Sequence, residues 1–337
     1  MLRELFDRLA MPSGASDFAA ERIAGWNNYR IARNRAGQAA LLIAHQMEAG
    51  GVAPADLELR HVAFLSAAEC QITSSEGTES GIFAVVRWKT SDGPLQDLFL
   101  EVLGSWIGTL GHSPNISTIR SGFDRLAQVF ADLERPAIRE VIGLWGELLV
   151  IACANDPEVL LRGWHVDPYE LHDFQAGLDL LEVKTTIAPL RRHDFTLAQL
   201  SPPSGTRLVV ASMMLSSHGG TLSILDLAQV VKARFANPEL KLRVDLAVIS
   251  AMGDVLQDTV SYRFNPHASA STLRFFDGSR IPCVSRVLPA EVSDVRFKVE
   301  LDGLAHLSDS ALQSISPFHA ASRPSLRPER WNVYERS

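Results

Sequence analysis

The sequence predicts an α/β (α+β) protein in which helices flank a central mixed β-sheet. Three observations predict this class. An apolar helical stretch covers about residues 136–154, three strand-like runs follow within 170–215, and a helix at 225–237 leads into another strand-like run at 242–252. Helices and strands that alternate in this order are typical of folds with helices packed on a mixed sheet. We therefore expect the core of the protein at residues 126–255.

The composition is that of an ordinary globular protein. Of its 337 residues, 46% are hydrophobic and 21% are charged, and the formal net charge is -7 at pH 7. No apolar run approaches the roughly 20 residues needed to cross a bilayer, and the charged amphipathic start lacks the apolar stretch of a signal peptide. Its three widely separated cysteines form neither a disulfide framework nor a zinc motif. We expect a cytoplasmic protein with no membrane partner.

The region before the core, residues 1–125, predicts an accessory α+β domain. The stretch "AALLIAHQM" (39–47) has apolar residues at helical spacing and glycines soon after it, so a helix is expected there. Runs rich in β-branched and aromatic residues at 57–65, 82–90 and 98–107 are separated by turn-forming residues and predict strands.

After the core, residues 256–337 predict a β-leaning C-terminal extension. Strand-like runs such as "VRFKVEL" (295–301) are followed by a short helix near the end. From about residue 317 the chain is rich in proline and arginine, which indicates a flexible tail. We expect the two accessory regions to select the target or to bind partner proteins.

The helix at 136–154 carries one unusual charge. Val141, Trp145 and Leu149 fall on one apolar stripe, and in the second half the apolar character extends round the whole helix. Glu147 is the sole charge in that second half. A carboxylate is rarely held in such surroundings without a partner or a metal ion. Glu147 is therefore a candidate site residue.

The stretch "LDLLEVKTT" (178–186) predicts the second strand of a hairpin. The first strand is expected at about 170–175, with the turn near Ala176–Gly177. Side chains two positions apart on a strand share a face, so Glu182 and Lys184 project together.

The hairpin brings a third charge close to this pair. Asp173 lies on the adjacent strand, roughly opposite residue 180 or 181 and within diagonal reach of Glu182. Asp179 has the opposite parity and lies next to the turn, so it is expected to be solvated. Two neighbouring carboxylates repel each other unless a cation lies between them.

A hard divalent cation suits this arrangement. Mg²⁺ is commonly held by one or two carboxylates, a backbone carbonyl and water, which here gives Asp173, Glu182 and the carbonyl of Val183. Lys184 could position the attacking water and offset charge on a phosphate. Glu147 could support the metal shell from the neighbouring helix.

These residues resemble the PD-(D/E)XK nuclease superfamily. The matching motif is Asp173, eight intervening residues, and Glu182-Val183-Lys184, and the "PD" dipeptide is here His172-Asp173. The wording "GLWGELLV", "LEVKTT", "RRHDFTLAQL" and "GWNNYRIARNRAGQAALLI" looks closest to bacterial PD-(D/E)XK motif proteins that accompany restriction-modification and phage-defence genes. The resemblance implies a restriction-endonuclease-like core and a metal-dependent endonuclease that uses Mg²⁺, for which Mn²⁺ can substitute.

The motif by itself is short, and a second Glu-x-Lys triplet occurs at Glu239-Leu240-Lys241. The first triplet has an aspartate across a hairpin, apolar flanks and the preceding helix with Glu147, whereas the second follows Asn237-Pro238. The plain alternative is that Glu182 and Lys184 are solvated residues of an edge strand.

Several polar residues around the motif are candidate nucleic-acid contacts, although each also suits an ordinary surface position: Thr185, Arg191, Arg192, His193 and Gln199. A hydroxyl or a cation beside the site could contact the phosphate backbone. His172 is a further candidate beside the site. Gln199 is expected in a short helical segment, where relatives place a polar residue that supports the site.

The expected function is cleavage of double-stranded DNA by a Mg²⁺-dependent restriction-type endonuclease, with a homodimer or other restriction or defence proteins as partners. The acidic net charge argues against indiscriminate binding of nucleic acid. It favours the alternative of a catalytically silent nuclease-fold subunit that recognises DNA or has a structural role in a defence complex. A nuclease that acts on RNA or single strands is a third alternative.

Overall fold

The computed structural model describes residues 2–45, 54–59, 61–89, 93–131, 138–165, 170–252, 262–284 and 292–325. The chain forms two compact units, Met1–Pro136 with Asn237–Gln257 and Ala137–Ala236 with Asp258–Ser337. The division expected from the sequence, into residues 1–125, a core at 126–255 and an extension at 256–337, stays a prediction. Among the helices of the described ranges, none has the length and apolarity needed to span a bilayer.

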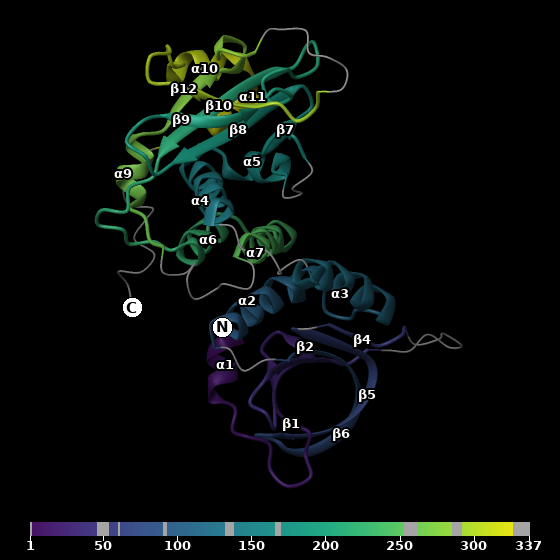
Figure 1. Ribbon diagram of the computed structural model, residues 1–337. Coiled ribbons are helices and arrows are strands. Elements are labelled where there is room, and N and C mark those ends of the chain that lie inside the picture. The colour runs from purple at the N-terminus through teal and green to yellow at the C-terminus, as the bar shows by residue number, and fades with distance from the viewer. Residues whose placement is uncertain are drawn as a thin grey trace. The chain divides into compact units, whose positions relative to one another are not determined.

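Unit 1 is built on a closed ring of strands (Figure 1). The strands are β1 (Phe18–Ile23), β2 (Trp26–Asn34), β3 (Ala39–Ile43), β4 (Leu57–Glu58), β5 (Val62–Ser74) and β6 (Gly77–Trp88). They lie in the order β1-β2-β3-β6-β5-β4, and a parallel pairing of β1 with β5 closes the ring. Small and large apolar side chains of these strands pack together in one hydrophobic core cluster, which includes Phe18, Ala20, Ala32, Ala40, Leu42, Ile72 and Phe83.

The helix expected at 39–47 is wrong. Residues Ala39–Ile43 form strand β3, which pairs with β2 on one side and β6 on the other, and all five residues are buried. A short apolar run with both faces covered has no polar position that would show a period, so strand and helix look alike in the sequence. The strand expected at 82–90 is confirmed by β6. The single strand expected at 57–65 is partly wrong, because this run contains β4 and the start of β5, which pair antiparallel.

Helices complete unit 1: α1 (Leu2–Arg8), α2 (Gly93–Leu110), α3 (Ile116–Ala131) and α7 (Pro238–Met252). The strands expected at 98–107 and 242–252 are therefore wrong, because both segments are helical. Their buried residues recur at helical spacing, as Val244, Val248 and Ala251 do in α7. Ser105 on α2 donates a hydrogen bond to Asp245 on α7 at 2.5 Å, so a polar contact ties the two helices together.

Unit 2 carries the motif. Its helices are α4 (Ile138–Cys153), α5 (Pro157–Gly163), α6 (Ile224–Lys232), α9 (Pro266–Ser271), α10 (Asp309–Ile315) and α11 (Pro317–Ser322), with a 3-10 turn η2 (Gly278–Arg280). Its strands are β7 (Phe174–Ala176), β8 (Asp179–Thr186), β9 (Arg192–Thr196), β10 (Arg207–Met214), β11 (Arg274–Asp277) and β12 (Arg296–Glu300).

The central sheet of unit 2 is mixed, as predicted. Its order is β11-β10-β8-β7, with β10 parallel to β8 and the outer pairs antiparallel. The helix, three strands, helix and further strand of the expected core correspond to α4, β7, β8, β10, α6 and β11. The last strand is thus β11 instead of residues 242–252.

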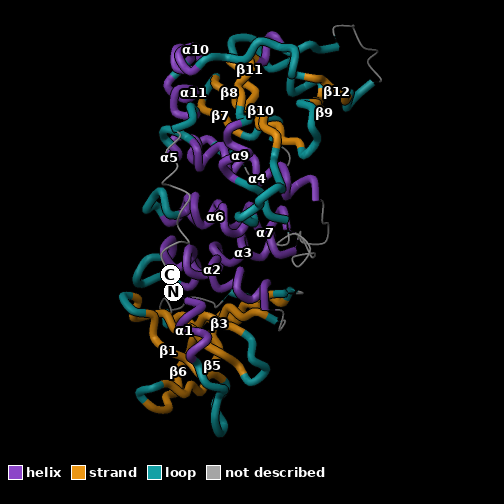
Figure 2. The backbone as a smooth tube through the Cα atoms, turned by 90° about the vertical axis from the view of Figure 1, so that its left-hand side faces the viewer, coloured by secondary structure: helices purple, strands orange, loops and turns teal. Residues whose placement is uncertain are grey.

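The C-terminal extension packs into unit 2 (Figure 2). Strand β12 pairs with β9 and forms a separate two-stranded sheet. The flexible tail expected from about 317 is partly wrong, because α11 is ordered and packs against α5 and β8. Residues 326–337 lie outside the described part of the chain.

Candidate active site

The hairpin that carries the motif has a two-residue turn at Gly177–Leu178, one position later than expected. Gly177 has a φ of 62°, the left-handed region that favours glycine at the first position of a II′ hairpin turn. Phe174 is paired with Leu181, which places Asp173 opposite Glu182. The later turn therefore moves Asp173 from a diagonal position to a direct one.

The backbone pairing of β7 with β8 begins at Phe174, and the side chain of the preceding residue, Asp173, makes the next contact with β8. Asp173 Oδ2 accepts a hydrogen bond from the backbone N–H of Val183 at 2.6 Å. The N–H and C=O of one strand residue point to the same edge, so the Val183 carbonyl also faces the edge beside Asp173. One edge of β8 thus offers a carboxylate and a backbone carbonyl close together.

Glu182 and Lys184 form a direct ion pair, with Lys184 Nζ 2.7 Å from Glu182 Oε1. Their side chains are only 3% and 17% exposed, so the pair lies at the base of the site and not on a solvated edge. Gln199 contacts both partners: its Nε2 donates to Glu182 Oε1 at 2.6 Å, and its Oε1 accepts from Lys184 Nζ at 3.2 Å.

Gln199 lies in a turn after β9, not in the expected helical segment. The N–H of Thr196 donates to Gln199 Oε1 at 3.1 Å, and His172 Nε2 lies 3.0 Å from the Gln199 backbone carbonyl. The two donors to Oε1, the Thr196 N–H and Lys184 Nζ, fix the direction of the side-chain amide, so its nitrogen faces Glu182.

Glu147 reaches the same place from α4. The Trp164 indole donates a hydrogen bond from Nε1 to Glu147 Oε2 at 2.7 Å. Helix α4 approaches β8 closely at Gly146, where a Cβ atom would lie 1.9 Å from Thr185 Cγ2. The missing Cβ atom of Gly146 therefore permits this close packing, which brings Glu147 near Asp173 and Lys184.

The three carboxyl groups influence one another electrostatically. Burial and then the Asp173 charge raise the pKa of Glu147 to about 8. Burial also raises the pKa of Asp173 well above its ordinary value, with the Glu182 charge as the next cause. Burial likewise raises the pKa of Glu182, although Lys184 opposes it. If all three carboxyl groups were ionised, the cluster would hold more negative charge than its one lysine balances.

Comparison with known proteins gives the family. A family model described as "Putative PD-(D/E)XK family member, (DUF4420)" matches residues 2–302. The chain belongs to this PD-(D/E)XK family. No curated protein and no solved structure matches it. The family confirms the resemblance drawn from the motif, and the mixed sheet of unit 2 is consistent with a PD-(D/E)XK nuclease-like fold.

The motif cluster has a buried acceptor atom that suits a cation. Glu182 Oε2 is buried and has no hydrogen-bond partner among the described residues, which is costly unless a proton or a cation compensates it. Within the described ranges, no group of three or more His, Cys, Asp or Glu side chains is arranged to hold a metal. A cation would thus depend on Asp173, Glu182, the Val183 carbonyl and water, a set of oxygen ligands that suits Mg²⁺.

Three of the residues expected to contact nucleic acid instead contact other residues of unit 2. Arg191 is 2% exposed, and its guanidinium donates to the carbonyls of Ser212 and Thr272. His193 is 3% exposed, with Nε2 2.8 Å from Ser212 Oγ. Arg192 is exposed but pairs with Glu300 at 2.8 Å. The structure gives Arg191 and His193 packing positions that a phosphate does not reach.

Thr185 and Asp179 also have internal partners. The Thr185 hydroxyl donates to the Ile142 carbonyl at 3.2 Å. The expectation that Asp179 is solvated is wrong: it is buried, with Arg207 Nε at 2.5 Å and His319 Nδ1 at 3.7 Å. His319 on α11 comes from far along the chain, and nothing in the sequence links it to Asp179.

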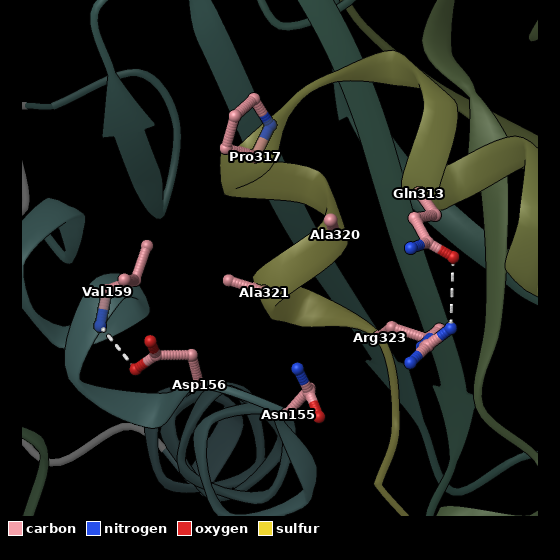
Figure 3. A pocket seen from close by; sticks show the side chains of 8 residues that line it. All are labelled: Asn155, Asp156, Val159, Gln313, Pro317, Ala320, Ala321 and Arg323. Atoms are coloured by element: carbon pink, nitrogen blue, oxygen red, sulfur yellow. Dashed lines mark hydrogen bonds between the residues drawn. The ribbon is translucent and has the colours of Figure 1, made fainter.

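A hollow of about 350 Å³ lies elsewhere in unit 2, between α5 and the α10–α11 pair (Figure 3). Val159, Pro317, Ala320 and Ala321 give it an apolar lining, and Asn155, Asp156, Gln313 and Arg323 are polar. None of the motif residues lines it. Arg323 donates to Gln313 Oε1 at 3.3 Å across one side, as the dashed line shows. The hollow is not part of the motif site.

Glu147 predicts a pH dependence of stability. Its pKa is raised from 4.5 to about 8, so the folded chain keeps a proton that the unfolded chain releases above about pH 4.5. The free energy of unfolding of the metal-free protein should therefore fall as pH rises from about 4.5 through 8. Urea denaturation at several pH values measures this, and Glu147→Gln should weaken the fall.

Buried histidines determine the pH range in which this effect of Glu147 can be measured alone. Burial lowers the pKa of His172 and His319, and that of His193 to about 4, from an ordinary value of 6.5. The unfolded chain binds more protons at these groups, so their effect is a rise of stability with pH up to about 6.5. Between pH 6.5 and 8 the effect of the Glu147 carboxyl on stability is therefore measured apart from that of the histidines. An equal slope in Glu147→Gln and wild type would contradict the prediction.

Proposed function

We propose that this PD-(D/E)XK protein is a Mg²⁺-dependent, restriction-type DNA endonuclease that acts in bacterial restriction-modification or phage defence. The single observation that carries the proposal is the buried Glu182–Lys184 pair with Asp173 across the hairpin and one Glu182 oxygen without a hydrogen-bond partner among the described residues. A structural ion pair has no need of a second carboxylate or of an acceptor that is left unpaired.

Asp173, Glu182 and the Val183 carbonyl would hold the metal ion. When bound, the ion supplies Lewis-acid stabilisation of the charge that develops on the phosphate. Lys184 orients the water that attacks phosphorus: Glu182 and Gln199 engage two of its three N–H donors, and the third has no hydrogen-bond acceptor among the residues that the structure describes. A P–O bond to the water oxygen forms while the P–O bond to the leaving sugar oxygen breaks. The attacking water gives a proton to bulk solvent, and the leaving sugar oxygen takes up a proton from it.

Glu147 supports this arrangement from α4. Its raised pKa reflects the burial and the Asp173 charge that a bound cation would offset. A cut through both strands requires two active sites, so the proposal includes a homodimer or an assembly with other restriction or defence proteins. Unit 1, with its own core, is a separate part of the chain that could select the target.

The net charge of -7 favours one alternative, a nuclease-fold subunit without catalytic activity in a defence complex. An acidic chain gains little affinity from counterion release on DNA, so a partner subunit would have to supply the basic residues that bind the DNA backbone. Thr185, Arg191, Arg192, His193 and Gln199 do not by themselves form an exposed basic surface.

The test is a cleavage assay with purified full-length protein. We expect duplex DNA to be cut in Mg²⁺ or Mn²⁺ and not in EDTA, with single-stranded DNA and RNA cut more slowly. Modified and unmodified phage DNA should be compared in the same assay. Divalent-ion-independent cleavage, or preferential cleavage of RNA, would contradict the proposal. DNA binding without cleavage in either ion would favour the catalytically silent subunit.

A further inference from the structure

A two-residue segment, Trp164–His165, runs beside the hairpin that carries the motif. It follows directly after α5, and Trp164 forms an antiparallel bridge with Phe174, the first residue of β7. The two rings stack at a centroid distance of 6.4 Å and an interplanar angle of 23°. The segment is thus a short extra edge next to β7, at the end of the hairpin where Asp173 lies.

The backbone of this segment holds the start of the hairpin. The N–H of His165 donates to the Asp173 carbonyl at 2.8 Å. Gly163, the residue before the segment, lets the chain approach β7 closely, because a Cβ atom at Gly163 would lie 2.5 Å from the Gln175 carbonyl oxygen. The position of the Asp173 backbone therefore depends on the Trp164–His165 segment as well as on β8.

The side chain of the same segment holds a second carboxylate. Trp164 is fully buried, and its Nε1–H donates to Glu147 Oε2 at 2.7 Å. An indole has one N–H donor and no acceptor, so the contact favours a carboxylate oxygen at that place. It fixes one Glu147 oxygen and leaves the other for the site. Trp164–His165 thus contacts Glu147 and Asp173 from one short stretch of chain.

We propose that Trp164 is a positioning residue for the metal centre, which orients Glu147 through its indole N–H while its bridge to Phe174 places Asp173. The inference rests on the proposed function, since it assigns a role within that site. Groups outside the ligand set that orient the metal-binding residues tune metal affinity by about 10- to 100-fold. Trp164 would act on the metal and the rate without contacting the substrate.

Another buried tryptophan provides a matched comparison. Trp145 lies on α4, two residues before Glu147, and is also fully buried. Its ring centroid lies 5.1 Å from that of Phe264. Its Nε1 has no hydrogen-bond partner among the described residues. The change Trp145→Phe removes an indole N–H without a carboxylate contact, whereas Trp164→Phe removes the one that binds Glu147. Both changes keep an aromatic ring in the core.

The experiment measures Mn²⁺ binding to the full-length protein by calorimetry, and kcat and KM for duplex DNA. We expect Trp164→Phe to weaken Mn²⁺ binding about tenfold or more and to lower kcat, with KM unchanged. Trp145→Phe should leave metal affinity and kcat close to wild type. Trp164→Phe combined with Glu147→Gln should lose little more than Glu147→Gln, because one contact is removed in both.

Equal Mn²⁺ affinity and equal kcat in the two tryptophan variants would overturn the inference while the nuclease assignment stands. Wild-type protein that binds no Mn²⁺ and cleaves no DNA would instead overturn the proposed function, and this role with it. If Trp164→Phe does not fold, the indole N–H signals of wild type are followed by NMR during Mg²⁺ addition. The Trp164 signal, assigned by its shift in Glu147→Gln, should move and that of Trp145 should not; the opposite result refutes the positioning role.

Discussion

Replacing Lys184 with methionine is expected to lower metal-dependent DNA cleavage about 10²- to 10³-fold, the effect typical of losing one group that stabilises transition-state charge. Methionine keeps most of the side-chain length and its apolar part, so contact with the Phe195 ring, 5.1 Å from Nζ, can persist. The donors to Glu182 Oε1 and Gln199 Oε1 are lost. Single-turnover cleavage at saturating Mg²⁺ measures the effect on the chemical step.

The second Glu-x-Lys triplet supplies the control. Lys241 stands two residues after Glu239 near the start of α7 in unit 1, so Lys241→Met changes the same residue type in the same local motif. We expect it to cleave like wild type. If Lys184→Met retains full activity, Lys184 does not act in the reaction; if both variants lose activity equally, the effect is not specific to the motif.

The motif could be found from sequence because it depends on local geometry. The alternation of side chains along a strand puts Glu182 and Lys184 on one face whatever the rest of the fold does, and a hairpin with a short turn brings Asp173 to them. The exact register could not be fixed, since the choice between a turn at 176–177 and one at 177–178 depends on the backbone that Gly177 adopts. A shift of one residue changes which side chains are opposite.

Partners distant in sequence had no comparable signal. Trp164 looks like any core tryptophan until α5 and β7 place its N–H beside Glu147. The imidazole of His319 lies 3.1 Å from the carbonyl of Leu180, across 139 positions of the sequence. Arg191, expected at a phosphate, is instead held by the carbonyls of Ser212 on β10 and of Thr272, the residue that follows α9. Each contact depends on tertiary packing, which a single sequence does not specify.

The misassigned elements share one cause. Residues 39–43, 98–107 and 242–252 are short apolar runs, for which helix and strand are difficult to separate by period. In residues 39–43, burial of every residue also leaves no polar position that would show the period. In β3 every residue is buried between two neighbouring strands, and the long-range pairing with β6 overrides the helix-forming alanines and leucines.

The change Asp173→Asn should have opposite effects on activity and on metal-free stability. Asparagine can still accept the hydrogen bond from the Val183 N–H through its amide oxygen, but it has no charge for a cation. Cleavage should fall about 10²-fold or more, as for Lys184→Met. Because burial and the Glu182 charge raise the pKa of Asp173, ionisation at this position destabilises the metal-free fold near neutral pH. Asp173→Asn should therefore raise the metal-free Tm.

Melting curves with and without Mg²⁺ separate these two effects. Wild type should gain stability with Mg²⁺, since a ligand that binds the folded chain shifts unfolding by mass action, and Asp173→Asn should gain much less. The control is Asp194→Asn on β9, a carboxylate that is 66% exposed and 3.9 Å from Lys298, which should change neither the Mg²⁺ response nor cleavage. A metal-free Tm below wild type in Asp173→Asn, with an unchanged Mg²⁺ response, would mean that Asp173 serves the hairpin alone. The combination of higher metal-free stability and lost Mg²⁺ response is expected only if its charge is retained to hold a cation.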